Sequence, residues 1–79
     1  MNKPIGSDAV RKAAELAGGQ LALAKAAGVK QGHIWAWINE RPIPPEHCAA
    51  VSVAVDGQVT VAELRPDIAR IFGDEETAA

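Results

Sequence analysis

The chain has 79 residues, of which 48% are apolar, and a formal net charge of −2 at pH 7. This length suits one small domain and leaves no room for a second. The single cysteine excludes an internal disulfide framework, and the lack of a signal peptide or a long apolar run predicts a cytoplasmic protein with no membrane partner.

The charge is unevenly distributed along the chain. Residues 1–48 hold six Lys or Arg and four acids, a balance of +2, whereas residues 49–79 hold two and six, a balance of −4. Domains that bind nucleic acid are usually basic, so the net charge argues against such a partner. Because the first half of the chain is basic, a nucleic-acid partner for that half is still possible.

Apolar residues recur at helical spacing, and no stretch alternates long enough for a strand, so the pattern predicts an all-α fold. In the first predicted helix, Ser7 or Asp8 is the expected cap, and the glycines at 18–19 end it. A second helix is expected over residues 20–27. Gly28 then ends it, in a position that favours a left-handed turn residue.

The third predicted helix covers residues 31–39, and a proline-rich link follows it. Pro44 or Pro45 can open a fourth helix at its first turn, because proline is tolerated there. This helix is expected to reach about Val55. Cys48 lies on its inner stripe and is expected to be a small buried apolar residue.

Thr60 and Glu63 have the spacing of a capping box and predict a short fifth helix. The five-helix unit then looks complete by Leu64. A further apolar stripe follows Pro66, and it consists of Ile68, Ile71 and Phe72. The expected organisation is one domain over residues 1–72 and an acidic flexible tail over residues 73–79.

Two short helices joined by a glycine-containing turn, over residues 20–39, are typical of a helix-turn-helix unit. The buried face of the second helix is predicted to hold Ile34, Trp37 and Ile38. In such units the second helix enters the DNA major groove. We therefore predict that its outward residues read DNA bases; these are Gln31, Gly32, His33, Trp35 and Ala36.

Basic residues around this helix predict contacts to the DNA backbone. Lys30 directly precedes the helix, and Lys25 and Arg41 lie on either side of it. Lysine suits phosphate and glutamine suits the edge of adenine, although solvated residues are the alternative at each position. Two other roles stay open for Trp35, namely covering the stem of a nearby Lys or Arg and contacting a protein partner.

The segments GGQLALAKAAGVKQGHIWAWINERPIPPEHC and VTVAELRPDI resemble the YdaS-type members of the Cro-like helix-turn-helix group, which are small bacterial and prophage DNA-binding regulators. The resemblance covers residues 10–68. It implies a five-helix all-α fold of the Cro/lambda-repressor type and binding to an operator. It also implies that Gln20 and Asn39 bind phosphates. The chain departs from the family in having Lys30 where Ser or Thr is usual and Trp35 where a small or polar residue is usual.

These observations predict a sequence-specific DNA-binding transcriptional regulator, either a Cro-like prophage repressor or an antitoxin-like autoregulator. Its partner would be a double-stranded DNA operator. The rival prediction is a protein-binding module that uses the same frame and the Trp35 surface to contact a toxin or a polymerase subunit.

Neither an enzyme nor a metal site is predicted. The acids do not form a paired set in an apolar pocket, and His47 with Cys48 lacks a second ligand pair at zinc spacing. Nothing in the sequence requires a cofactor.

A homodimer is expected, because one recognition helix reads only a few base pairs and paired helices enter successive major grooves about 34 Å apart. The stripe after Pro66 either contributes to this dimer or folds back on its own core.

Overall fold

The computed structural model describes residues 3–68. These residues form five helices, and none of them lies in a strand: α1 (Ser7–Ala17), α2 (Gln20–Ala27), α3 (Gln31–Asn39), α4 (Pro45–Ala54) and α5 (Val61–Leu64). The predicted all-α class is confirmed. Apart from the start of α1, the helix boundaries agree with those expected from the glycines, prolines and capping residues.

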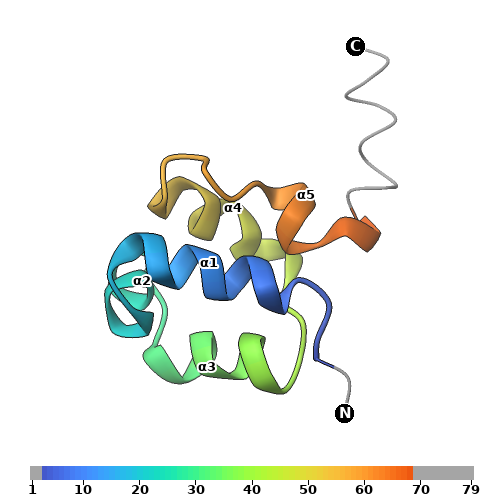
Figure 1. Cartoon of the computed structure of the whole chain (residues 1–79), viewed down its shortest axis with the longest axis horizontal. Helices are drawn as coiled ribbons and strands as arrows, with labels where there is room; N and C mark the ends of the chain where they lie inside the picture. Colours follow the sequence, from blue (N-terminus) through green and yellow to red (C-terminus); the bar gives the residue numbers. More distant parts are fainter. Residues whose placement is uncertain (1–2, 69–79) are drawn as a thin grey trace.

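Helix α1 occupies the centre of the molecule, and Figure 1 shows α3 on one side of it and α4 with α5 on the other. It contacts all four of the other helices, and α2 also contacts both α3 and α4. Helix α3 therefore packs against α1 and α2 with its inner side and lies at the edge of the fold. This placement leaves the outer side of α3 open to a partner.

The core contains side chains from every helix and from the two loops that flank α4. Trp37 is only 2% exposed, which confirms its predicted core position, and Cys48 is also buried as expected. Burial raises the pKa of the Cys48 thiol, whose Sγ donates to the carbonyl oxygen of Pro44 at 3.6 Å. The largest fully buried side chains are Trp37, Leu23, Ile34, Ile43, Leu64, Val10, Val51 and Val59.

The start of α1 differs from the prediction that Ser7 or Asp8 caps this helix. Gly6 is the N-cap, with a φ of 76° and no side-chain cap hydrogen bond, while Ser7 is a buried first residue of the helix. A Cβ on Gly6 would overlap the carbonyl oxygen of Leu64 and lie 2.8 Å from its carbonyl carbon. The close approach of α5 thus requires glycine here, which no local capping rule indicates.

The predicted capping box at α5 is confirmed. The backbone N–H of Thr60 donates to Glu63 Oε1 at 2.9 Å, and the Glu63 N–H donates to Thr60 Oγ1 at 3.2 Å. The hydrogen bond from the Thr60 backbone is the main reason that the pKa of Glu63 is lowered. Thr60 and Glu63 therefore define where this short helix begins.

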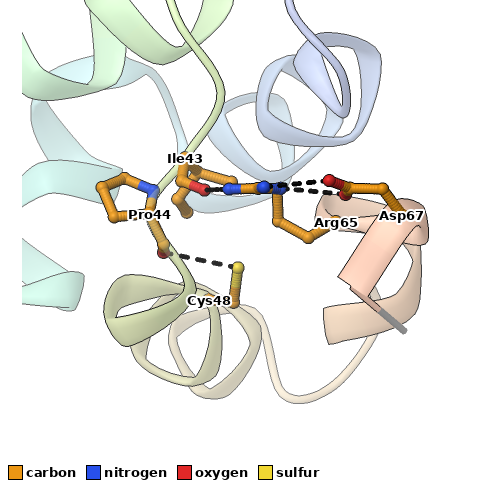
Figure 2. A network of polar contacts seen from close by, with 5 residues as sticks. All are labelled: Ile43, Pro44, Cys48, Arg65 and Asp67. Atoms are coloured by element: carbon orange, nitrogen blue, oxygen red, sulfur yellow. Dashed lines mark hydrogen bonds and ion pairs between the residues drawn. The ribbon is translucent and has the colours of Figure 1, made fainter. Parts of the chain in front are cut away.

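The fifth helix ends at Leu64 as expected, and residues just after it still contact the fold. Figure 2 shows the Arg65 guanidinium between the α3–α4 link and Asp67. Its Nη1 donates to the carbonyl oxygen of Ile43 at 2.7 Å, and its Nε and Nη2 donate to the two carboxylate oxygens of Asp67, each at 3.0 Å. The bonds from Arg65 to the Asp67 carboxylate lower the pKa of Asp67. The bond to the Ile43 carbonyl ties residues 65–67 to the link that follows α3.

Residues 66–68 add a single helical turn after the five helices, and Ile68 is half-buried. The rest of the predicted apolar stripe, Ile71 and Phe72, and the predicted tail over residues 73–79 lie outside the described residues. No helix within 3–68 has the length and apolar character needed to cross a membrane.

Candidate nucleic-acid interface

The predicted helix pair is present as α2 and α3, joined by a short turn. Gly28 ends α2 with a φ of 76°, in the left-handed region that glycine adopts without strain. The N–H of Val29 donates to the Ala24 carbonyl oxygen at 2.9 Å, which closes the turn. Ala24 is buried, and its small side chain permits the close packing of α2 in the core. The turn thereby directs the chain from α2 into α3.

The N-terminal turn of α3 is exposed, as the sequence predicted. Lys30, Gln31 and Gly32 all face solvent. A Cβ on Gly32 would meet no atom within 4 Å, so the space in front of the backbone is open. Trp35, one turn later, is 49% exposed. These residues form a surface that a partner can approach without rearrangement of the fold.

The prediction that Ala36 faces outward is wrong. Ala36 is only 4% exposed, and it lies in a run of residues, Ile34 to Ile38, in which Trp35 alone is exposed. Because α3 contacts both α1 and α2, its buried sector is wider than a single apolar stripe. A methyl group at this position is too short to project beyond that sector. Ala36 therefore supports the packing of α3.

His33 is exposed, but its ring already has partners within the protein. Its Nδ1 accepts the N–H of Lys30 at 3.3 Å, and the Lys30 carbonyl oxygen accepts the His33 N–H at 2.9 Å. The ring also stacks on Trp37, with the ring centroids 6.0 Å apart and the planes inclined by 15°. Trp37 lies a further 5.4 Å from the ring of His47 on α4.

This arrangement explains how α3 begins without the usual hydroxyl cap. An ammonium group has no acceptor, so the Lys30 side chain cannot cap the helix. His33, three residues later, supplies the acceptor for the Lys30 N–H, as Glu or Gln does in an ordinary capping box. Its Nδ1 is therefore committed to the helix terminus, which leaves only Nε2 for an external ligand.

The predicted backbone-binding cations are all exposed. Lys25 and Lys30 lie near the turn, and Arg41 follows the end of α3. The Arg41 guanidinium is 3.8 Å from the Glu40 carboxylate, and both side chains are more than half exposed. Such a surface ion pair contributes little, so it does not prevent Arg41 from pairing with another anion.

Three of the predicted site residues, Gln20, Trp35 and Asn39, line one open groove of about 420 Å³. Asn39 Nδ2 donates to the carbonyl oxygen of Trp35 at 3.0 Å, which holds the amide beside the indole. The groove also includes Arg11, Ala14, Glu15, Gly19 and Ile38. It therefore runs between α1, the start of α2 and the second half of α3.

Sequence reasoning did not single out Arg11 and Glu15 as site residues. Both are exposed residues of α1, four positions apart, and on the sequence they look like an ordinary solvated face. Their proximity to Trp35 follows from the packing of α1 on α3. The four-residue spacing is the only signal that places them on one side of the helix.

Comparison with known proteins identifies the family. Residues 10–71 match the family model described as "Bacterial toxin YdaS". The chain belongs to this family. It is also 41% identical, over 59 residues, to "Putative transcriptional regulator YdaS" of Escherichia coli (strain K12). The aligned region covers 73% of this chain and 60% of the E. coli protein, so the chain spans less than two thirds of that relative's length. No solved structure matches it.

The matched YdaS region contains all five described helices except the first residues of α1. It therefore includes the helix pair, the groove and the Arg65 network. In the part of the chain that the structure describes, His, Cys, Asp and Glu side chains form no group of three or more that could hold a metal ion.

Proposed function

We propose that this YdaS-family protein is a sequence-specific DNA-binding regulator of transcription. The observation that carries the proposal is the exposed N-terminal turn of α3, presented by a helix-turn-helix pair at the edge of the fold. The name of the E. coli relative, a transcriptional regulator, supports the same role. In this proposal the protein acts by occupying an operator, as a repressor or an autoregulator, and requires neither a catalytic step nor a cofactor.

The proposed base contacts come from the start of α3. Gln31 can donate and accept through its amide and so suits the edge of adenine in the major groove. Gly32 lets the backbone approach the DNA closely, because it has no side chain and the space that a Cβ would occupy is open. His33 can offer only Nε2, and the buried Ala36 is not proposed as a contact. Gln31 is therefore the principal base reader.

The proposed backbone contacts surround this turn. Lys25, Lys30 and Arg41 supply cations, and Gln20 and Asn39 supply amides. The overall charge of −2 does not oppose this arrangement, since the acids are concentrated after residue 48. Individual exposed cations can attract phosphates whatever the sign of the overall charge.

Selection of bound sequences from a random DNA pool, followed by binding measurements at several salt concentrations, tests the proposal. Gln31→Ala should relax the preference at one base position and cost about 1 to 3 kcal/mol of operator binding. Lys30→Ala should weaken operator and random DNA alike and reduce the salt slope by about one. If the wild-type protein enriches no sequence and its DNA binding is negligible at low salt, the proposed function is wrong.

We further propose that the protein binds its operator as a homodimer, since two recognition helices select a longer site than one. The segment after Pro66 is the proposed contributor to the dimer. Ending the chain after Asp67 keeps the pair between Arg65 and Asp67. Sedimentation should then show a monomer that retains its helicity by circular dichroism and binds the operator more weakly. An unchanged dimer, or loss of helicity, would exclude this role of the segment.

A protein-binding module is the second candidate, because the family is described as a toxin and the half-exposed indole of Trp35 suits a protein interface. The salt dependence separates the two functions. Neutralised phosphates cause a steep loss of affinity with salt, whereas an interface centred on one indole does not.

A further inference from the structure

We propose that the groove between α1 and α3 seats the sugar–phosphate strand bordering the major groove, and that Arg11 of α1 contacts a phosphate there. The inference rests on the proposed DNA-binding function and assigns a DNA contact to α1. It starts from the groove itself, in which Arg11 lies with Trp35, Gln20 and Asn39.

The packing of the helices places this groove beside the DNA. A major groove is about 12 Å wide, so α3 fills it when the exposed turn reaches the bases. Packed helices lie about 8 to 10 Å apart, and α1 packs directly on α3. The groove opens at the surface between α1 and the second half of α3. In the proposed docking, the strand at the edge of the major groove passes over this opening. Arg11 is the cation that α1 contributes to the groove lining.

The polar groups of the groove suit a phosphate. Arg11 offers a planar set of N–H donors, which matches the phosphate oxygens. Asn39 uses one amide N–H on the Trp35 carbonyl oxygen and keeps a second N–H for a ligand. The Gln20 amide lies at the start of α2, on the same groove. Together these groups form a donor set around one anionic segment.

The apolar wall of the groove suits a deoxyribose. The Trp35 residue is half-exposed and lines the same groove as the two amides, whereas Gln31 at the N-terminal turn of α3 does not line it. A sugar ring presents an apolar surface between two phosphates, and an indole can pack against it. We therefore assign Trp35 to the DNA backbone, so its contribution should not depend on base sequence.

Glu15 is the one acidic residue that lines the groove. No ion pair joins its carboxylate to Arg11 among the residues from 3 to 68. Its negative charge would oppose a phosphate in the groove, because like charges at close range repel. Glu15 thus limits the affinity that Arg11 and the amides provide.

A matched pair of variants tests the role of Arg11. Lys12 is the neighbouring exposed cation on α1, and it does not line the groove. Arg11→Gln and Lys12→Gln change the net charge equally. Arg11→Gln should weaken operator binding about fivefold to tenfold at 0.1 M salt and reduce the salt slope by about one. Lys12→Gln should change the affinity less than about twofold and leave the slope unchanged.

Two further variants test the rest of the groove. Glu15→Gln should strengthen binding to operator and random DNA, whereas Asp8→Asn, the same charge change at an exposed α1 residue outside the groove, should have a smaller effect. Trp35→Ala should weaken operator and random DNA by the same factor.

Equal effects of Arg11→Gln and Lys12→Gln would overturn the groove assignment while leaving the DNA-binding function intact. A sequence-dependent effect of Trp35→Ala would overturn the sugar contact and return Trp35 to base reading. Unchanged DNA affinity after both Arg11→Gln and Trp35→Ala, in a protein that still binds the operator, would exclude the groove from the DNA interface and leave it to a protein partner. Failure of wild-type binding would instead refute the proposed function.

Discussion

Gly6→Ala should destabilise the fold more than the same substitution at a left-handed glycine whose Cβ would meet no neighbouring atom. Gly6 has a φ of 76°, where a Cβ costs about 1 to 2 kcal/mol. The added methyl group would also overlap the Leu64 carbonyl oxygen, which is backbone and cannot rotate away. Overpacking of this kind costs about 1 to 3 kcal/mol. The expected loss is therefore about 2 to 5 kcal/mol, a large part of the stability of a domain this small.

Gly28→Ala is the matched control for this prediction. Gly28 has the same φ of 76°, but a Cβ there would meet no atom within 4 Å. The Gly28→Ala variant should therefore lose only the stability that the left-handed backbone conformation costs, about 1 to 2 kcal/mol. Urea denaturation followed by circular dichroism measures both free energies of unfolding, and thermal midpoints should differ between the variants by about 4 to 8 °C per kcal/mol. Equal losses in the two variants would show that the contact between Gly6 and Leu64 does not constrain the fold.

Three other predictions concern the recognition helix and the C-terminal network. Trp37→Ala should cost about 3 to 5 kcal/mol of stability by opening a cavity in the core, whereas Trp35→Ala should leave the thermal midpoint near that of the wild type; the reverse order would refute the assigned faces of α3. His33→Gln keeps an acceptor for the Lys30 N–H and should bind DNA better than His33→Phe, which keeps only the stacked ring; equal affinities would show that the cap does not position α3. Asp67 has a lowered pKa because of its bonds to the Arg65 guanidinium, so its stabilising effect should be complete above about pH 4 and disappear as the pH falls through the lowered folded-state pKa. Asp67→Asn should therefore be less stable than the wild type at pH 7, and the difference in urea midpoint should close below about pH 4; a difference that persists at pH 2 would contradict this cause.

The sequence was sufficient for features that depend on near neighbours. Glycine at 28, the prolines at 44 and 45, and the box formed by Thr60 and Glu63 each act on the backbone within a few residues, so they predicted where helices begin and end. The period of the apolar residues also placed Trp37 in the core and Trp35 on the surface. The resemblance to the YdaS family could be recognised from the sequence because the family's motifs coincide with these local signals.

The tertiary structure decided the features that depend on contacts between distant segments. Gly6 is required by the carbonyl group of Leu64, and Arg65 binds the carbonyl oxygen of Ile43. Arg11 and Trp35 line one groove only because α1 packs on α3. Ala36 is buried because α3 has two neighbours, and a periodic pattern does not reveal how many neighbours a helix has. Local rules follow from backbone geometry over one or two turns, whereas these contacts depend on how whole helices pack, and the chain encodes that packing only through the combined shape of its core.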